Sequence, residues 1–199
     1  MLKVALTGGI ATGKSYVLDQ FRRRGIPCLD ADVLAHGVTT AGTEATRAIS
    51  ARFGPGVIAL DGSADRQQLA LIVFADRNAR RDLEAIVHPP VYRAIAAGLR
   101  AFELMGDARL AVVDVPLLYE SGHEGDFDRV IAATCPLDLQ IQRLAARGLS
   151  DADARARLAA QLPAAEKASR ADYVVQTDGT IDDTNRQIDD ILQRLTLGS

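Results

Sequence analysis

A glycine-rich segment near the start of the chain constrains its fold more than any other feature. Residues 8–15 match the pattern G-x-x-x-x-G-K-[ST] without a gap. The segment follows an apolar stretch and precedes an amphipathic one, so it predicts a turn between a strand and a helix. In such a turn, successive backbone N–H groups point inward at a helix N-terminus and bind phosphate. We therefore predict a phosphate-binding loop, hereafter the P-loop. The nucleotide-binding residues predicted there are Gly8, Gly9, Ile10, Ala11, Thr12, Gly13, Lys14, Ser15 and the adjoining Tyr16.

Three side chains carry the predicted phosphate and metal chemistry. Lys14 would reach the β and γ phosphates, and the Ser15 hydroxyl would bind Mg²⁺. Asp114 ends the apolar stretch 110–114, which has the form of a Walker B segment whose carboxylate supports Mg²⁺. An Asp at a strand end is often only a helix cap. Together with the P-loop, the pattern favours a metal role for Asp114.

Short apolar stretches alternate with amphipathic ones along the chain, which is typical of βα units around a mostly parallel sheet. The predicted strands are 4–7, 26–29, 110–113, 130–133 and 173–175. About eighty residues separate the second strand from the third, whereas one crossover needs only about a dozen. We therefore expect a helical insertion, with helices over 42–53, 65–75, 78–87 and 91–105. The predicted fold class is α/β, a P-loop-type parallel sheet flanked by helices.

Helix boundaries are marked outside the insertion as well. A helix is predicted from Lys14 to near Arg24, with Gly25 as its stop. Another follows Pro136 and stops at Gly148. Ser150, with an acidic residue three positions later, predicts a capping box that opens the next helix. The Ala- and Arg-rich composition of 145–170 predicts a solvated pair of helices.

Two carboxylates follow the second predicted strand, at Asp30 and Asp32. Alternate residues of a strand point to the same face, so both are expected to face the crevice at the carboxyl edge of the sheet. A carboxylate there can orient a substrate hydroxyl for in-line attack. Since a turn or helix cap explains one Asp better than two, we predict a functional role for Asp32.

Composition and missing motifs exclude several classes of protein. A formal net charge of -3 provides no field that would recruit nucleic acid. No secretory signal and no long apolar run is evident, so we expect a cytoplasmic protein without a membrane segment. Switch GTPases are excluded because N-K-x-D and D-x-x-G are absent. Large remodelling ATPases usually need more chain, which leaves a small phosphotransferase as the favoured class.

Four segments together make the assignment more specific. They are 6–10 (LTGGI) leading into the P-loop, 30–36 (DADVLAH), His88-Pro89, and 114–120 (DVPLLYE). In order and spacing they resemble the dephospho-CoA kinase family over nearly the whole chain. The resemblance implies ATP-dependent phosphorylation of the ribose 3′-hydroxyl of dephospho-CoA, the last step of coenzyme A biosynthesis. It also implies a P-loop kinase core at 1–36, 108–135 and 171–199, a CoA-binding insertion at about 37–107, and a lid at about 136–170.

The same resemblance suggests roles for individual residues. Asp32 matches the family's base or hydroxyl-orienting Asp, and Arg143 matches a lid arginine. Arg143 and Arg147 stand four residues apart, so we expect them on one helix face, from which they could move onto the ATP phosphates. Residues 177–180 (TDGT) stand where the family often has an Asn-Gly turn near the adenine of ATP, and Gln161 matches a lid glutamine. The predicted substrate-binding residues are Asp32, His36, His88, Leu117 and Glu120.

Two other functions stay open at this point. One is a different small-molecule P-loop kinase, of the nucleoside monophosphate or shikimate type, although these lack the combination of 30–32 with 116–118. The other is a nucleotide-dependent binding module that hydrolyses ATP slowly. Acceptor-stimulated turnover would distinguish it from both kinases. Neither an obligatory protein partner nor a nucleic acid partner is predicted.

Overall fold

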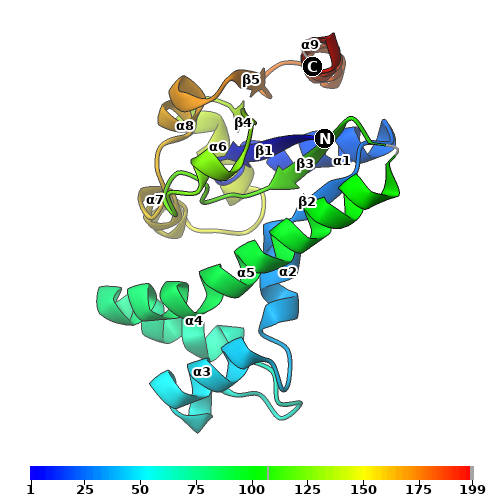
Figure 1. Ribbon diagram of the computed structural model, residues 1–199. Helices are drawn as coiled ribbons and strands as arrows, with labels where there is room; N and C mark the ends of the chain where they lie inside the picture. Colours follow the sequence, from blue (N-terminus) through cyan, green and yellow to red (C-terminus); the bar gives the residue numbers. More distant parts are fainter. Residues whose placement is uncertain (107, 198–199) are drawn as a thin grey trace. The chain divides into compact units, whose positions relative to one another are not determined.

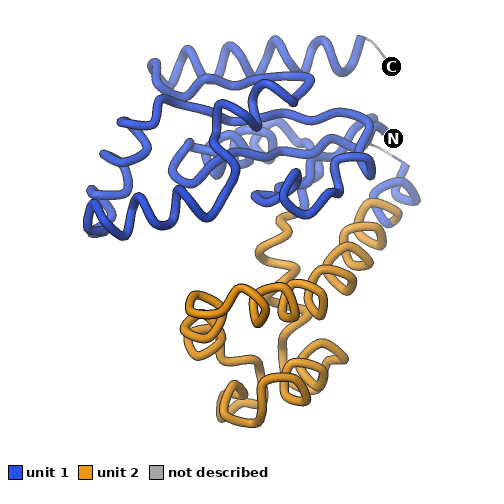
Figure 2. Tube along the Cα trace, turned by 90° about the vertical axis from the view of Figure 1, so that its left-hand side faces the viewer, with its two compact units in different colours: residues 1–29, 101–199 blue, residues 30–100 orange. Residues whose placement is uncertain are grey.

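The computed structural model describes residues 1–106 and 108–197 and divides the chain into two compact units. Unit 1 comprises Met1–Leu29 and Ala101–Ser199, and unit 2 comprises Asp30–Arg100 (Figure 2). The insertion boundary predicted at residue 107 and the core boundary at residue 199 lie outside the described residues.

Unit 1 contains a five-stranded sheet in the order β2-β3-β1-β4-β5 (Figure 1). The strands are β1 (Leu2–Gly8), β2 (Cys28–Asp30), β3 (Leu110–Asp114), β4 (Arg129–Thr134) and β5 (Tyr173–Gln176). The pairs β1–β3, β1–β4 and β4–β5 are parallel. All five predicted strands are therefore present, and the predicted α/β class is confirmed.

The helices of unit 1 are α1 (Lys14–Arg23), α6 (Leu137–Ala145), α7 (Asp151–Ala159), α8 (Ala164–Arg170) and α9 (Ile181–Leu197). Of these, α1 and α6 begin where the sequence predicts and α7 opens after the predicted cap, whereas no bounds were predicted for α8 and α9. Gly25 and Gly148 follow α1 and α6 with positive φ angles of 76° and 85°, as expected of glycine stops. Ser150 Oγ accepts from the N–H of Asp153 at 3.1 Å, which confirms the predicted cap.

The core of unit 1 lies between the sheet and the helices α1 and α9. Val4, Leu6 and Val112 of the central strands are fully buried beside Phe21 of α1 and Ile188 of α9. Most of β1 is buried on both faces of the sheet, so its apolar residues do not alternate with polar ones. This packing fixes the end of β1, from which the P-loop begins.

Unit 2 is helical, as predicted for the insertion. Its elements are α2 (Ala31–Val38), α3 (Glu44–Phe53), the short 3₁₀ helix η1 (Pro55–Val57), α4 (Arg66–Ala75) and most of α5 (Arg77–Met105). Thr43 and Asp65 cap α3 and α4 with side-chain oxygens. The core of this unit gathers around Ile49, Val57 and Leu69.

The predicted break between residues 87 and 91 is wrong, because α5 runs without interruption through Pro89 and Pro90. Proline removes backbone donors, but its fixed φ is compatible with a helix. Val91, Ile95 and Leu99 are buried at successive turns beyond the prolines. Tertiary packing of this stripe therefore outweighs the local cost of the two prolines.

In the described part of the chain, no helix is both long enough and apolar enough to cross a membrane.

Candidate active site

The P-loop adopts the strand-turn-helix geometry that its pattern predicts. It leaves β1 at Gly8 and enters α1 through Gly13, whose φ of 81° lies in the left-handed region that favours glycine. A Cβ on Gly8 would lie 2.6 Å from the carbonyl oxygen of Ala133, so any larger residue would displace β4. Within the loop, the buried Thr12 hydroxyl donates to the carbonyl of Gly9 at 2.8 Å. The loop is thus held by its own backbone and by the neighbouring strand.

Ala11 occupies a left-handed conformation with φ of 61°, the only non-glycine residue with positive φ in the described ranges. An L-residue with a Cβ is disfavoured there by about 1–2 kcal/mol. The Ala11 carbonyl is held by Arg143 Nη1, which donates to it at 3.1 Å. Local strain in the P-loop is therefore balanced by a bond from α6.

Lys14 and Asp114 form an ion pair at the carboxyl edge of the sheet. Their side chains are only 13% and 5% exposed. β1 and β3 are neighbours in register, with Leu6 opposite Asp114, so β3 ends beside the strand that leads into the loop. The two charges that the sequence assigns to phosphate and to metal thus lie in direct contact.

The donor set at this edge fits Mg²⁺. Ser15, exposed in the first turn of α1, and Asp114 both offer oxygen ligands, which Mg²⁺ prefers. No group of three or more His, Cys, Asp or Glu side chains gathers to hold a metal among the described residues. Kinase sites commonly bind Mg²⁺ through one or two protein ligands, with phosphate and water completing the shell.

Arg143 lies in the last turn of α6 and holds the P-loop to the end of β5. Besides Ala11, its guanidinium donates to the carbonyl of Thr177 at 2.6 Å. Thr177 in turn donates through Oγ1 to the carbonyl of Thr12, also at 2.6 Å. Arg147 is exposed and lies beyond α6, which ends at Ala145, so the predicted shared helix face is wrong. The chain turns toward Gly148 before a further helical turn can form.

A buried lysine beside this edge was not predicted. Lys167 of α8 is fully buried, and its Nζ donates to the Pro116 carbonyl at 2.6 Å. It also pairs with Glu120 Oε1 at 2.8 Å. Burial lowers the pKa of Lys167, and the hydrogen bond with Glu120 opposes that shift. The expectation that α8 is merely solvated is therefore wrong, although the scarcity of lysine (Lys3, Lys14 and Lys167 only) was a signal.

Glu120, predicted to bind substrate, is engaged within the protein in this structure. Its Oε1 accepts the Lys167 bond and a second one from the backbone N–H of Leu162 at 2.9 Å. The segment that joins α7 to α8 is thereby tied to the loop after β3. Leu117, on the same loop, is half-buried, and its carbonyl accepts from the N–H of Ser121.

Asp30 and Asp32 do not share a strand face, contrary to prediction. β2 ends at Asp30, and Asp32 lies in the first turn of α2. Asp30 Oδ1 accepts from the backbone N–H groups of Asp32 and Val33 at 2.9 and 3.1 Å, so Asp30 is the helix cap. Asp32 is exposed and its carboxylate is left for other chemistry, as is the exposed imidazole of His36 in the last turn of α2.

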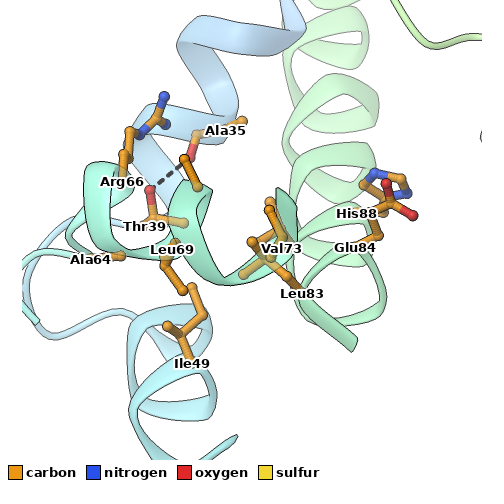
Figure 3. A pocket seen from close by; sticks show the side chains of 12 residues that line it. Ala35, Thr39, Ile49, Ala64, Arg66, Leu69, Val73, Leu83, Glu84 and His88 are labelled. Atoms are coloured by element: carbon orange, nitrogen blue, oxygen red, sulfur yellow. Dashed lines mark hydrogen bonds between the residues drawn. The ribbon is translucent and has the colours of Figure 1, made fainter. Parts of the chain in front are cut away.

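Unit 2 contains a pocket of about 340 Å³ (Figure 3). Figure 3 shows Arg66 on one side and Glu84 with His88 on the other, with apolar side chains such as Leu69 and Val73 between them. His88 also makes an edge-on ring contact with Tyr92, at 6.4 Å between centroids. This predicted substrate-binding residue therefore lines a cavity and does not cap a helix end.

Comparisons with known proteins agree with this geometry. The family model described as Dephospho-CoA kinase matches residues 2–183. A dephospho-CoA kinase of Geobacillus kaustophilus is 43% identical over 194 residues, which is 97% of this chain and 96% of that protein. A crystal structure from Thermus thermophilus has a TM-score of 0.82 at 34% identity and covers 98% of this chain and 97% of its own. The dephospho-CoA kinase structure from Campylobacter jejuni has a TM-score of 0.73 at 26% identity and covers 98% of each chain. The chain belongs to the dephospho-CoA kinase family.

Proposed function

We propose that this chain phosphorylates the ribose 3′-hydroxyl of dephospho-CoA with ATP and Mg²⁺ in the cytoplasm, giving CoA and ADP. The observation that carries the proposal is the family match over residues 2–183, which spans the P-loop and all five strands. The ion pair of Lys14 with Asp114 supports it, because it brings the phosphate-binding and metal-binding groups to one place.

On the donor side, the P-loop amides bind the phosphates of ATP, and Lys14 leaves Asp114 to contact the β and γ phosphates. Asp114 and Ser15 are then available to hold Mg²⁺. When bound, the ion neutralises charge on the phosphate oxygens. Arg143 and Arg147 are the candidates for neutralising charge on the transferred group, and residues 177–180 for contacting the adenine of ATP.

On the acceptor side, Asp32 orients the 3′-hydroxyl and accepts its proton. The hydroxyl oxygen forms a bond to the γ-phosphorus while the bond from that phosphorus to the bridging oxygen breaks, and ADP leaves. The exposed carboxylate of Asp32 supports this assignment, because Asp30 has the capping role.

Further substrate contacts are proposed in the helical insertion and in the loop after β3. We place part of the dephospho-CoA chain in the pocket of unit 2, where His88 and the apolar lining offer mixed polar and apolar contacts. His36 and Leu117 are further candidates for substrate contact. Glu120 acts through Lys167 and Leu162 and is therefore proposed as a positioning residue.

The first experiment measures ADP formation from Mg-ATP with dephospho-CoA, adenosine, AMP and shikimate as separate acceptors. Turnover with dephospho-CoA alone, with a product that behaves as CoA, is the expected result. Lys14→Ala is the control, and full activity in that variant would contradict the role of the P-loop. ATP binding without turnover on any acceptor would favour a nucleotide-dependent binding module instead.

A further inference from the structure

Unit 1 contains a second pocket, of about 440 Å³, to which the proposed function assigns no ligand, although Gly9 and Ile10 of the P-loop line part of it. Its walls come from the first half of the P-loop, the start of α6, the end of α7 and the start of α8. Ile10, Leu137, Leu158 and Leu162 make most of the lining apolar. A volume of several hundred Å³ with apolar walls is typical of a small-molecule site.

Two glutamines on this lining have unsatisfied amide oxygens. Among the described residues, Oε1 of Gln140 and Oε1 of Gln161 are buried and accept no hydrogen bond. Gln140 is only 3% exposed, and its Nε2 donates to the carbonyl of Cys135 at 3.2 Å. That bond fixes the orientation of the amide, so Oε1 is the amide atom of this lining residue that has no partner. A buried acceptor without a donor costs about 1–3 kcal/mol, which a ligand can recover.

Gly9 of the P-loop packs closely against the same glutamine, Gln140. A Cβ on Gly9 would come within 3.2 Å of Gln140 Oε1 and 3.1 Å of the Ala164 side chain. A residue larger than glycine would therefore crowd the unsatisfied oxygen. Gln161 is held by its neighbour, because the N–H of Leu162 donates to Glu120, which Lys167 fixes in turn.

The chemistry of the lining defines the ligand. Amide oxygens accept hydrogen bonds, so the ligand must present N–H or O–H groups, and the leucine-rich walls suit a flat ring. An aminopurine combines both, since its exocyclic amine carries two N–H donors on an apolar ring. Both substrates of the proposed reaction contain adenine, so the position of the pocket must decide between them.

The position of the pocket along the P-loop favours the adenine of the acceptor, dephospho-CoA, over that of ATP. Gly13, at the α1 end of the P-loop, has Thr177 as its nearest neighbour, and residues 177–180 are the candidates for the adenine of ATP. Gly9 stands at the other end of the loop and faces Gln140 and Ala164 instead. Resting on the proposed function, we infer that this pocket binds the adenine of dephospho-CoA, with Gln140 and Gln161 as acceptors for its amine.

The test compares bases on both substrates. Wild-type protein is assayed with dephospho-CoA and with its analogue in which hypoxanthine replaces adenine, and separately with ATP and ITP as donors. Hypoxanthine has an oxygen in place of the amine, and two amide oxygens would repel it. We expect the wild type to prefer dephospho-CoA over the analogue by at least about tenfold in kcat/KM.

Gln161→Met and Gln140→Met remove the two acceptors. Each is expected to raise the KM for dephospho-CoA about tenfold and to reduce the preference for adenine in the acceptor, while the preference for ATP over ITP is unchanged. Gln142→Met is the matched control, because Gln142 is exposed on the same helix. Gln161 is less buried than Gln140, so its variant tests the inference even where Gln140→Met fails to fold.

Three results would overturn the inference. If the wild type used dephospho-CoA and its hypoxanthine analogue equally well, the protein would not recognise the exocyclic amine of adenine. Variants that retain the full preference for dephospho-CoA would place its base elsewhere. Loss of the preference for ATP over ITP would assign the pocket to the donor base. Failure of the proposed function is distinct, because the wild type would then not phosphorylate dephospho-CoA at all.

Discussion

Lys14, the first residue of α1, forms an ion pair with Asp114, the last residue of β3. The pair joins the two motifs that the sequence presents separately, a hundred residues apart. With side-chain exposures of 13% and 5%, it is a largely buried pair, so each partner stabilises the other in the absence of nucleotide. We therefore expect a substitution of Lys14 to affect stability as well as the proposed catalysis.

This ion pair predicts that Lys14→Met loses stability as well as activity. Removing the cation beside a buried carboxylate is expected to lower the free energy of unfolding by about 3 kcal/mol. Turnover should fall by at least about a hundredfold, because the charge on the transferred phosphate loses a partner. The double variant Lys14→Met/Asp114→Asn should regain most of the stability and none of the activity. Urea unfolding checks this, and a single variant as stable as the wild type would contradict it.

The different positions of Asp30 and Asp32 predict opposite phenotypes. Asp30→Ala removes the cap of α2 and should lower stability by about 1 kcal/mol, whereas Asp30→Ser retains most of it. Asp32→Asn should change stability by less than about 1 kcal/mol but reduce kcat at least about a hundredfold, with ATP affinity unchanged. Thermal unfolding, steady-state kinetics and ATP titration separate the two. Equal losses of stability in Asp30→Ala and Asp32→Asn would contradict the separate roles.

The features that depend on local pattern could be predicted from the sequence. The P-loop, the five strands, the cap at Ser150 and the left-handed glycine stop at Gly148 follow from glycine placement, apolar runs and capping residues. Each needs only a few neighbouring residues to form. The Walker B strand is of the same kind, since β3 and its terminal Asp114 are contiguous.

Features set by tertiary packing could not be predicted in this way. The uninterrupted α5 depends on burial of Val91, Ile95 and Leu99, which outweighs the propensity of Pro89-Pro90. The burial of Lys167 depends on Glu120, 47 positions earlier in the chain. The phosphate role of Arg143 stays a prediction. Its hydrogen bonds to the carbonyls of Ala11 and Thr177 and to Thr177 Oγ1 could not be predicted, because contacts between distant segments leave no signal in a sequence. Contacts of this kind are decided by the fold and not by residue type.

The left-handed Ala11 predicts a stabilising substitution. Ala11→Gly removes the clash of a Cβ at φ of 61° and should raise the free energy of unfolding by about 0.5–1 kcal/mol. Ala156→Gly is the matched control, because Ala156 is exposed within α7 and should lose about 1 kcal/mol. Thermal unfolding of both variants measures the contrast. Destabilisation of equal size in the two would show that the loop does not hold Ala11 in this conformation.

The ion pair of the buried Lys167 with Glu120 predicts a pH-dependent stability. Because burial lowers the pKa of Lys167 below its usual 10.5, the unfolded chain binds more protons than the folded one between the lowered value and 10.5. The free energy of unfolding should therefore rise with pH across that window. Glu120→Gln removes the hydrogen bond that opposes the lowering of the Lys167 pKa, so this pKa falls further. In the variant, the free energy of unfolding therefore begins to rise at a lower pH. The variant's loss of stability relative to wild type should be largest near neutral pH and shrink toward pH 10.5.

Urea unfolding of this variant at several pH values between 7 and 10 checks the sign, with Glu166→Gln as the control. Glu166 lies exposed on α8, the helix that carries Lys167. Glu166→Gln therefore makes the same exchange of Glu for Gln without altering the pair of Lys167 with Glu120. Burial raises the pKa of Cys28 to about 11, so stability above pH 9 falls through this thiol in wild type and in both variants. The difference between Glu120→Gln and the control cancels that common effect. A difference that stays constant with pH would mean that Lys167 keeps the same protonation state throughout, and that Glu120 acts on α8 through packing alone.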